Sequence, residues 1–136
     1  MKDWICYHNA HDRQCEYKSI GESAFYFGGS SKPNIGDKVW VIEAIGKPNH
    51  KEFRLVDCFI ISEILIQKDP LPDTKKNNRN TKVYGIKSLM KGKSPVYFNQ
   101  ISGDILEPLL QYVKTAPGFS GAGKRINGLE KLLSLA

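Results

Sequence analysis

Residues 35–46 read IGDKVWVIEAIG, and the fold can be worked out from this stretch outward. Gly36 and Asp37 are a turn signal, because glycine adopts backbone angles that other residues avoid. An apolar run of β-branched and aromatic residues follows at once, and such residues favour strands. The stretch therefore predicts a strand over residues 38–45 that is entered from a tight turn and carries Trp40, one of two tryptophans.

Short apolar runs on either side of this stretch predict a mainly β chain. The other expected strands are residues 4–8, 25–27, 53–67, 81–86 and 95–98. Residues 53–67 are too many for one flat strand, so we expect a bulge or bend near Asp57 or Ser62.

Two helices are expected late in the chain. Ile105, Leu109 and Tyr112 have helical spacing, with Ser102 or Asp104 as the N-cap, and a second helix is expected over residues 129–135. These elements do not alternate as a Rossmann sheet requires. The expected fold class is a small mixed β-barrel with peripheral helices, α+β, in a single domain that covers residues 1–136.

The net charge of +6 is concentrated in one segment. Between Lys68 and Lys93, eight basic residues stand against two acidic ones, whereas the other 110 residues carry twelve of each. A local excess of this kind predicts a phosphate-binding surface, and a solvated lysine-rich loop is the alternative. The expected phosphate-binding residues are Lys75, Lys76, Arg79, Lys82, Lys87, Lys91 and Lys93.

The sequence gives no reason to expect a membrane or an oxidising compartment. No apolar run is long enough to cross a bilayer, and the acidic first residues do not resemble a signal peptide. The three cysteines are an odd number, which favours free thiols in a reducing environment. We therefore expect a cytoplasmic protein without disulfides.

Two motifs suggest enzyme chemistry, and neither is complete. GFSGAGKR, residues 118–125, follows the phosphate-loop pattern until Arg125, where serine or threonine would hold magnesium, so a glycine-rich connector is favoured. Four residues near the N-terminus could bind zinc, although their spacing fits no common motif and ordinary burial is favoured: Cys6, His8, His11 and Cys15. Since the acidic residues are scattered, we expect no catalytic group, no metal and no cofactor.

Three segments resemble a known family. MKDWI, IGDKVWVIEA and FRLVDCFIISEI are similar in order and spacing to strands of EVE-type domains in the PUA-like superfamily, which also contains the YTH and SRA readers. The resemblance implies a small β-barrel whose aromatic pocket accepts a single, often modified, base. The residues that it implies for this pocket, with the serines and Lys32 near its mouth, are Trp4, Tyr7, Phe27, Ser30, Ser31, Lys32 and Trp40.

Together these patterns predict a non-enzymatic reader. It would bind double-stranded DNA and flip a modified cytosine into the aromatic pocket, as similar modules do at the front of modification-dependent restriction endonucleases, with a nuclease domain or subunit as a further partner. Two alternatives stay open: an RNA-binding regulator on the same fold, and a small zinc-dependent enzyme.

Overall fold

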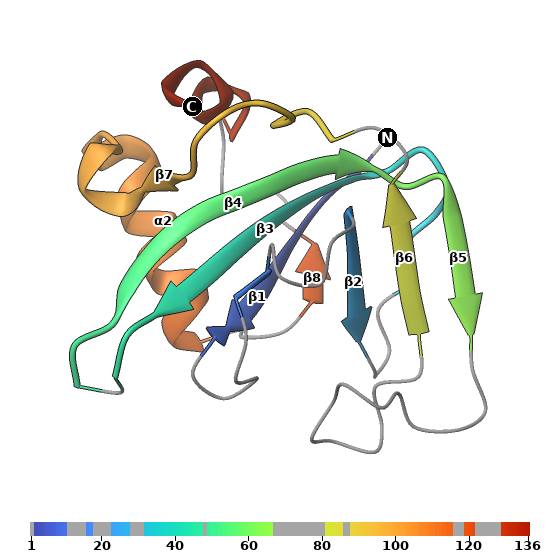
Figure 1. Ribbon diagram of the computed structural model, residues 1–136, viewed down its shortest axis with the longest axis horizontal. Coiled ribbons are helices and arrows are strands. Elements are labelled where there is room, and N and C mark those ends of the chain that lie inside the picture. The colour runs from blue at the N-terminus through green and yellow to red at the C-terminus, as the bar shows by residue number, and fades with distance from the viewer. Residues whose placement is uncertain are drawn as a thin grey trace.

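The computed structural model shows a mixed α+β architecture in which a five-stranded sheet adjoins a three-stranded sheet (Figure 1). It describes residues 2–10, 16–17, 23–27, 32–47, 49–66, 81–85, 88–115, 119–121 and 129–136.

The larger sheet has the strand order β7-β4-β3-β1-β8. Its strands are β1 (Asp3–Asn9), β3 (Lys38–Ile45), β4 (Glu52–Ile60), β7 (Val96–Tyr97) and β8 (Phe119–Gly121). β1 runs parallel to β3, with Trp4 paired to Val39, whereas β4 returns antiparallel to β3. Gly36 has φ of +96° in the turn before β3, so the predicted glycine turn is confirmed together with the strand that follows it.

The long segment after the β3–β4 connection has the expected irregularity, and it departs from a flat strand near Asp57 as well as near Ser62. Val41 is paired with Asp57 but Ile42 with Leu55, so Val56 is the extra residue of a β-bulge. β4 then ends at Ile60, and the chain enters the second sheet.

The smaller sheet is antiparallel with the order β2-β6-β5. Its strands are β2 (Ser23–Phe27), β6 (Thr81–Gly85) and β5 (Glu63–Ile66). It meets β4 closely, because a Cβ atom on Gly85 would lie only 2.4 Å from Cδ2 of Phe59. The Ser62 N–H also donates to the Tyr84 carbonyl at 2.8 Å, which fixes the corner between the sheets.

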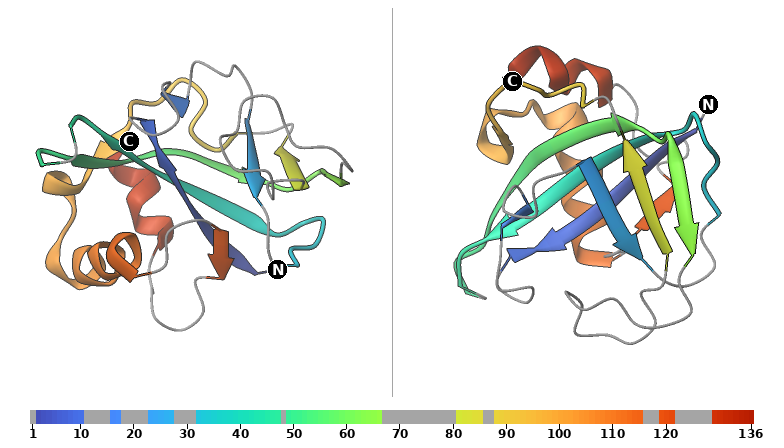
Figure 2. Two further views of the ribbon diagram at one scale, coloured as in Figure 1. Left: turned by 90° about the horizontal axis from the view of Figure 1, so that it is seen from below. Right: turned by 45° about the vertical axis from the view of Figure 1, so that its right-hand side comes forward.

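Side chains alternate between two apolar clusters on opposite faces of the larger sheet. One face, with Ile5 and Trp40, packs against α2 (Gly103–Thr115) and the 3-10 helix η4 (Leu129–Leu135). We call this the helix-side cluster; it also includes the short 3-10 helix η2 (Phe98–Gln100) through Phe98. The other face, with Cys6 and Val41, packs against Phe25 and Phe27 of β2 in what we call the inter-sheet cluster. Figure 2 shows the helices and the smaller sheet on different sides of the long strands.

Most of the expected elements are confirmed, and the α+β class with them. Among the described strands, however, the two sheets do not close into the expected barrel, because each keeps two edge strands in its hydrogen-bonding order. β8 was not predicted, since it lies within the glycine-rich segment that reads as a connector; Gly118 and residues 122–125 of that segment lie outside the described residues. No helix in the described ranges is long and apolar enough to span a membrane.

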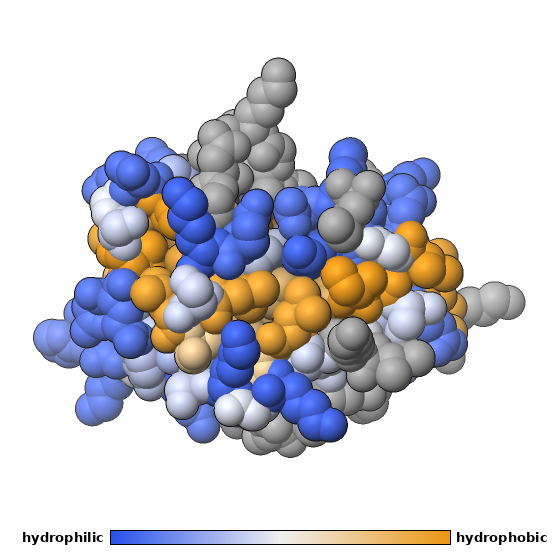
Figure 3. Space-filling view, turned by 90° about the horizontal axis from the view of Figure 1, so that it is seen from above, coloured by the Kyte–Doolittle hydropathy of each residue, from blue (hydrophilic) through white to orange (hydrophobic). Residues whose placement is uncertain are grey.

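Hydrophobic side chains also reach the surface. Figure 3 shows a band of hydrophobic residues between hydrophilic flanks on the face seen from above. The most exposed large apolar side chain among the described residues is Ile66, at 77%, and its neighbour Leu65 is partly exposed. Both belong to β5, so this edge strand presents apolar groups where the lysine-rich segment begins.

Candidate nucleic-acid interface

Lys82 lies between two tyrosine rings on the smaller sheet. Tyr26 is directly opposite Lys82 in the β2–β6 pairing, and Tyr84 follows two residues later on the same face of β6. The Lys82 ammonium is 4.6 Å from the Tyr26 ring centroid and 4.3 Å from that of Tyr84. The negative faces of both rings therefore stabilise a cation that is only 6% exposed. We call these three residues the Tyr-Lys-Tyr group.

The connection from β5 to β6, residues 67–80, starts and ends at this sheet and carries the first part of the lysine-rich segment; we call it the lysine-rich connection. β5 ends at Ile66 and β6 begins at Thr81, and these two residues are paired across the strands. The connection between them carries the predicted Lys75, Lys76 and Arg79, which lie outside the described residues. The topology therefore ties the most basic part of the chain to the strand end next to Lys82.

The other predicted phosphate-binding residues lie further along the chain. Lys91 and Lys93 are exposed, and Lys87 falls outside the described ranges. The Lys93 ammonium donates to the Leu133 carbonyl at 3.2 Å, which links this segment to the last turn of η4. Lys93 therefore has a structural contact in addition to its predicted role.

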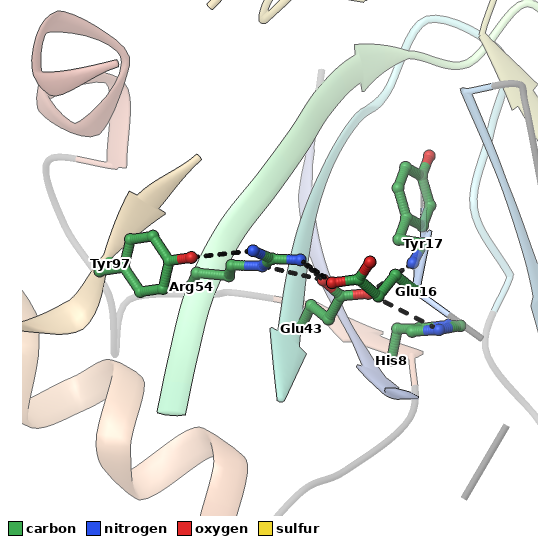
Figure 4. A network of polar contacts seen from close by, with 6 residues as sticks. All are labelled: His8, Glu16, Tyr17, Glu43, Arg54 and Tyr97. Carbon is green, nitrogen blue, oxygen red and sulfur yellow. Dashed lines mark hydrogen bonds and ion pairs between the residues drawn. The ribbon is translucent and has the colours of Figure 1, made fainter. Parts of the chain in front are cut away.

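Buried charged side chains form a network in the larger sheet, near the end of β3 and the start of β4 (Figure 4). Glu43 is fully buried, and its Oε1 accepts from Arg54 Nε at 2.9 Å and from the Arg54 terminal nitrogen at 2.7 Å. Its Oε2 accepts from the Tyr17 backbone N–H and lies 3.8 Å from His8 Nε2. Both carboxylate oxygens thus have partners, as a buried charge requires.

Arg54 extends this network to the surface. It donates to the Tyr97 hydroxyl at 2.9 Å and to the exposed Glu16 carboxylate at 3.0 Å. Burial tends to lower the pKa of Arg54, but its hydrogen bonds to Glu43 and Tyr97 outweigh that effect and raise it. The guanidinium is therefore a permanent cation that joins β3, β4 and β7.

Asp57 is a second buried carboxylate on the inter-sheet side. Its Oδ2 accepts from the Tyr17 hydroxyl and from Ser23 Oγ, both at 2.8 Å. Its Oδ1 accepts from the Cys58 N–H at 2.8 Å and from Ser88 Oγ. Burial, followed by the nearby Asp57 charge, raises the pKa of Tyr17, so the phenol keeps its proton and acts as a donor.

The two tryptophans are not brought together. Trp4 lies in the inter-sheet cluster and Trp40 in the helix-side cluster, on opposite faces of one sheet. Each indole N–H donates to a carboxylate on the neighbouring strand or turn, Trp4 to Asp37 at 2.9 Å and Trp40 to Asp3 at 3.0 Å. The two rings therefore cannot hold one base between them.

The remaining predicted pocket residues are also dispersed. Tyr7 packs beside the helix-side cluster, Phe27 is buried between the sheets, and Lys32 is exposed. Ser30 and Ser31 lie outside the described residues. Of the predicted pocket residues, the structure places Trp4 with Phe27 in the inter-sheet cluster and Tyr7 with Trp40 at the helix-side cluster.

The structure describes two of the four residues that the zinc alternative requires. Cys6 and His8 are two residues apart on β1 and lie on the inter-sheet face. His11 and Cys15 fall in the segment that the structure does not describe. Over the part of the chain that it does describe, no three acidic, histidine or cysteine side chains form a metal-binding group.

Sequence reasoning missed the residues around Tyr17. Glu43 and Asp57 were visible as acidic residues within apolar strands, and Glu43 continues the inward-facing series of Val39 and Val41. An inward-facing carboxylate needs buried partners, and that was the available signal. Nothing in the sequence identified Tyr17 as the partner of both carboxylates.

Comparisons of the chain with protein-family models, with curated proteins and with solved structures give no match.

Proposed function

We propose that the protein binds nucleic acid and reads a modified base, namely a modified cytosine that is flipped out of double-stranded DNA. The observation that carries this proposal is the position of the Tyr-Lys-Tyr group, because Lys82 lies beside the strand end at which the lysine-rich connection enters β6. Cations supply affinity for phosphates, and the buried Lys82 adds its charge at the strand end from which the lysine-rich connection leaves.

The energetics of flipping are compatible with a surface of this kind. Taking a base out of the stack costs a few kcal/mol, and stacking on an aromatic side chain returns about 1–3 kcal/mol per base. Phosphate contacts from the lysine-rich connection would offset the rest.

The chain's own architecture supports a PUA-like assignment of the EVE type as part of this proposal. A glycine turn leads into β3, which pairs with the N-terminal strand, in a small α+β fold. In this proposal the protein acts as the specificity module of a restriction system and works with a nuclease domain or subunit.

A binding titration tests the proposal. Matched duplexes that contain cytosine, 5-methylcytosine or 5-hydroxymethylcytosine are compared at two salt concentrations, with a single-stranded RNA of equal length. A preference for one modified duplex that persists at the higher salt is expected. Tighter binding to RNA would favour the RNA-binding alternative, and equal, steeply salt-dependent binding to every ligand would contradict base reading.

The Tyr-Lys-Tyr group supplies a residue-level test. Lys82→Gln should weaken binding to all duplexes about equally, because it removes a positive charge beside the lysine-rich connection, not a direct phosphate contact, and leaves any base-specific contact in place. Lys131→Gln is the control, since Lys131 is exposed on η4 at a distance in sequence from the lysine-rich segment. Equal effects of the two substitutions would show that only net charge matters.

A further inference from the structure

Tyr17 occupies an aromatic environment between the two sheets. Its side chain belongs to the inter-sheet cluster, with Trp4, Phe25 and Phe27, and is only 3% exposed. The His8 ring stands edge-on to the Tyr17 ring, with centroids 6.2 Å apart and an interplanar angle of 82°. The Tyr17 side chain is thus enclosed by aromatic and apolar side chains, and a pocket that reads a flipped base is lined by side chains of the same kind.

The hydroxyl of Tyr17 both donates and accepts. It donates to Asp57 Oδ2 at 2.8 Å and accepts from the Ala24 backbone N–H at 3.1 Å. Cytosine likewise has an amino donor beside a ring-nitrogen acceptor on its pairing edge, and a carboxylate is the usual acceptor for that amino group. The phenol ring and a pyrimidine ring are both six-membered.

We propose that Tyr17 fills the base-reading site in the free protein and that the flipped base enters by displacing it. Asp57 then accepts from the amino group of the base, and the Ala24 N–H donates to its ring nitrogen. This inference rests on the proposed function and names the site in which the base is read.

The surroundings of Asp57 suit such an exchange. Ser23, the Cys58 N–H and Ser88 also donate to this carboxylate, so it keeps its orientation when Tyr17 leaves. Tyr17 is held in addition by its backbone N–H, which donates to Glu43. A base must replace these contacts. Because the free protein favours the state in which Tyr17 fills the site over the open state, its apparent affinity for DNA is lowered.

Weakening the Tyr17 contacts should therefore strengthen binding. Tyr17→Phe keeps the ring but removes both hydroxyl contacts, and we expect about fivefold tighter binding to the preferred modified duplex. The control is Tyr112→Phe, because Tyr112 is also buried and its hydroxyl donates to the Ile5 carbonyl in the helix-side cluster. Unchanged or weaker binding by Tyr17→Phe, or equal gains in both variants, would overturn the inference.

A small-ligand test separates this inference from the function on which it rests. Tyr17→Gly should leave a ring-sized space, so free 5-methylcytosine should raise the Tm of this variant and leave that of the wild type unchanged. Toluene is the control for an unspecific apolar cavity, and an equal or larger rise with toluene, or no rise with 5-methylcytosine, would overturn the inference.

If the wild type prefers a modified duplex but the Tyr17 variants behave like Tyr112→Phe, the proposed function stands and this site falls. Binding of 5-methylcytosine by Tyr17→Gly without any duplex preference in the wild type would support the site and contradict the function.

Discussion

At the scale of the residue, Asp37 explains why a Gly-Asp turn precedes β3. Its carboxylate accepts from the Lys2 N–H at 3.0 Å and from the Asn34 N–H and the Trp4 indole, both at 2.9 Å. Burial opposes ionisation, but these donors outweigh it and lower the pKa of Asp37 below its usual value of 3.8. The turn therefore anchors the first strand through one charged side chain.

Asp37→Asn should weaken this anchor and remove its pH dependence, because the uncharged amide keeps only one acceptor oxygen for the three donors. A lowered pKa in the folded state stabilises the protein above the unfolded-state value, and the contribution is lost as the pH falls through the folded-state pKa. The free energy of unfolding in urea should fall by about 1–3 kcal/mol at neutral pH, and its decline below about pH 4 should become shallower than in the wild type. Asp3→Asn is the control, because the side-chain oxygen of Asn can still accept from the Trp40 indole. A decline in acid as steep as that of the wild type would contradict the role of Asp37.

At the scale of the element, the corner between the sheets depends on a close approach of β6 to β4. Gly85→Ala would place a methyl group 2.4–2.8 Å from the fully buried side chain of Phe59, so we expect a loss of about 1–3 kcal/mol in the free energy of unfolding. Gly103→Ala is the matched control, because nothing lies within 4 Å of a Cβ atom at the start of α2. Equal urea midpoints for the two variants would show that the corner tolerates a side chain.

Most of the elements were readable from the sequence, whereas their assembly was not. The strand 38–45 follows from local chemistry, since glycine and β-branched residues act where they stand. The bend near Ser62 was also expected, but the chain's change of sheet there depends on pairing with β6, far along the chain. Such pairing is a long-range choice that local propensity cannot specify. The same reason explains why β8 was missed, since it is a short edge strand in a glycine-rich segment.

At the scale of the whole molecule, the charge distribution was predictable and the buried cluster was not. The excess of lysines is visible in the sequence, and the topology attaches it to the smaller sheet. Tyr17, Glu43 and Asp57 are brought together from separate segments, with sequence separations of 26 and 40 residues from Tyr17. Their partnership exists only after two sheets have packed, so spacing along the chain could not reveal it.

The position of the positive charge, rather than its sum, should decide nucleic-acid affinity. Replacing Lys75, Lys76 and Arg79 with glutamine should weaken binding to every duplex and reduce the slope of log K against log salt by about 0.9 for each phosphate that is no longer neutralised. The ratio between modified and unmodified duplexes should stay the same, because phosphate contacts carry no information on the base. The matched control removes three exposed lysines elsewhere, Lys47, Lys51 and Lys131, and leaves the same net charge. If both triple variants show the same decrease in affinity and slope, binding follows the overall charge of the protein; if only the first does, the lysine-rich connection is the part of the surface that meets the phosphates.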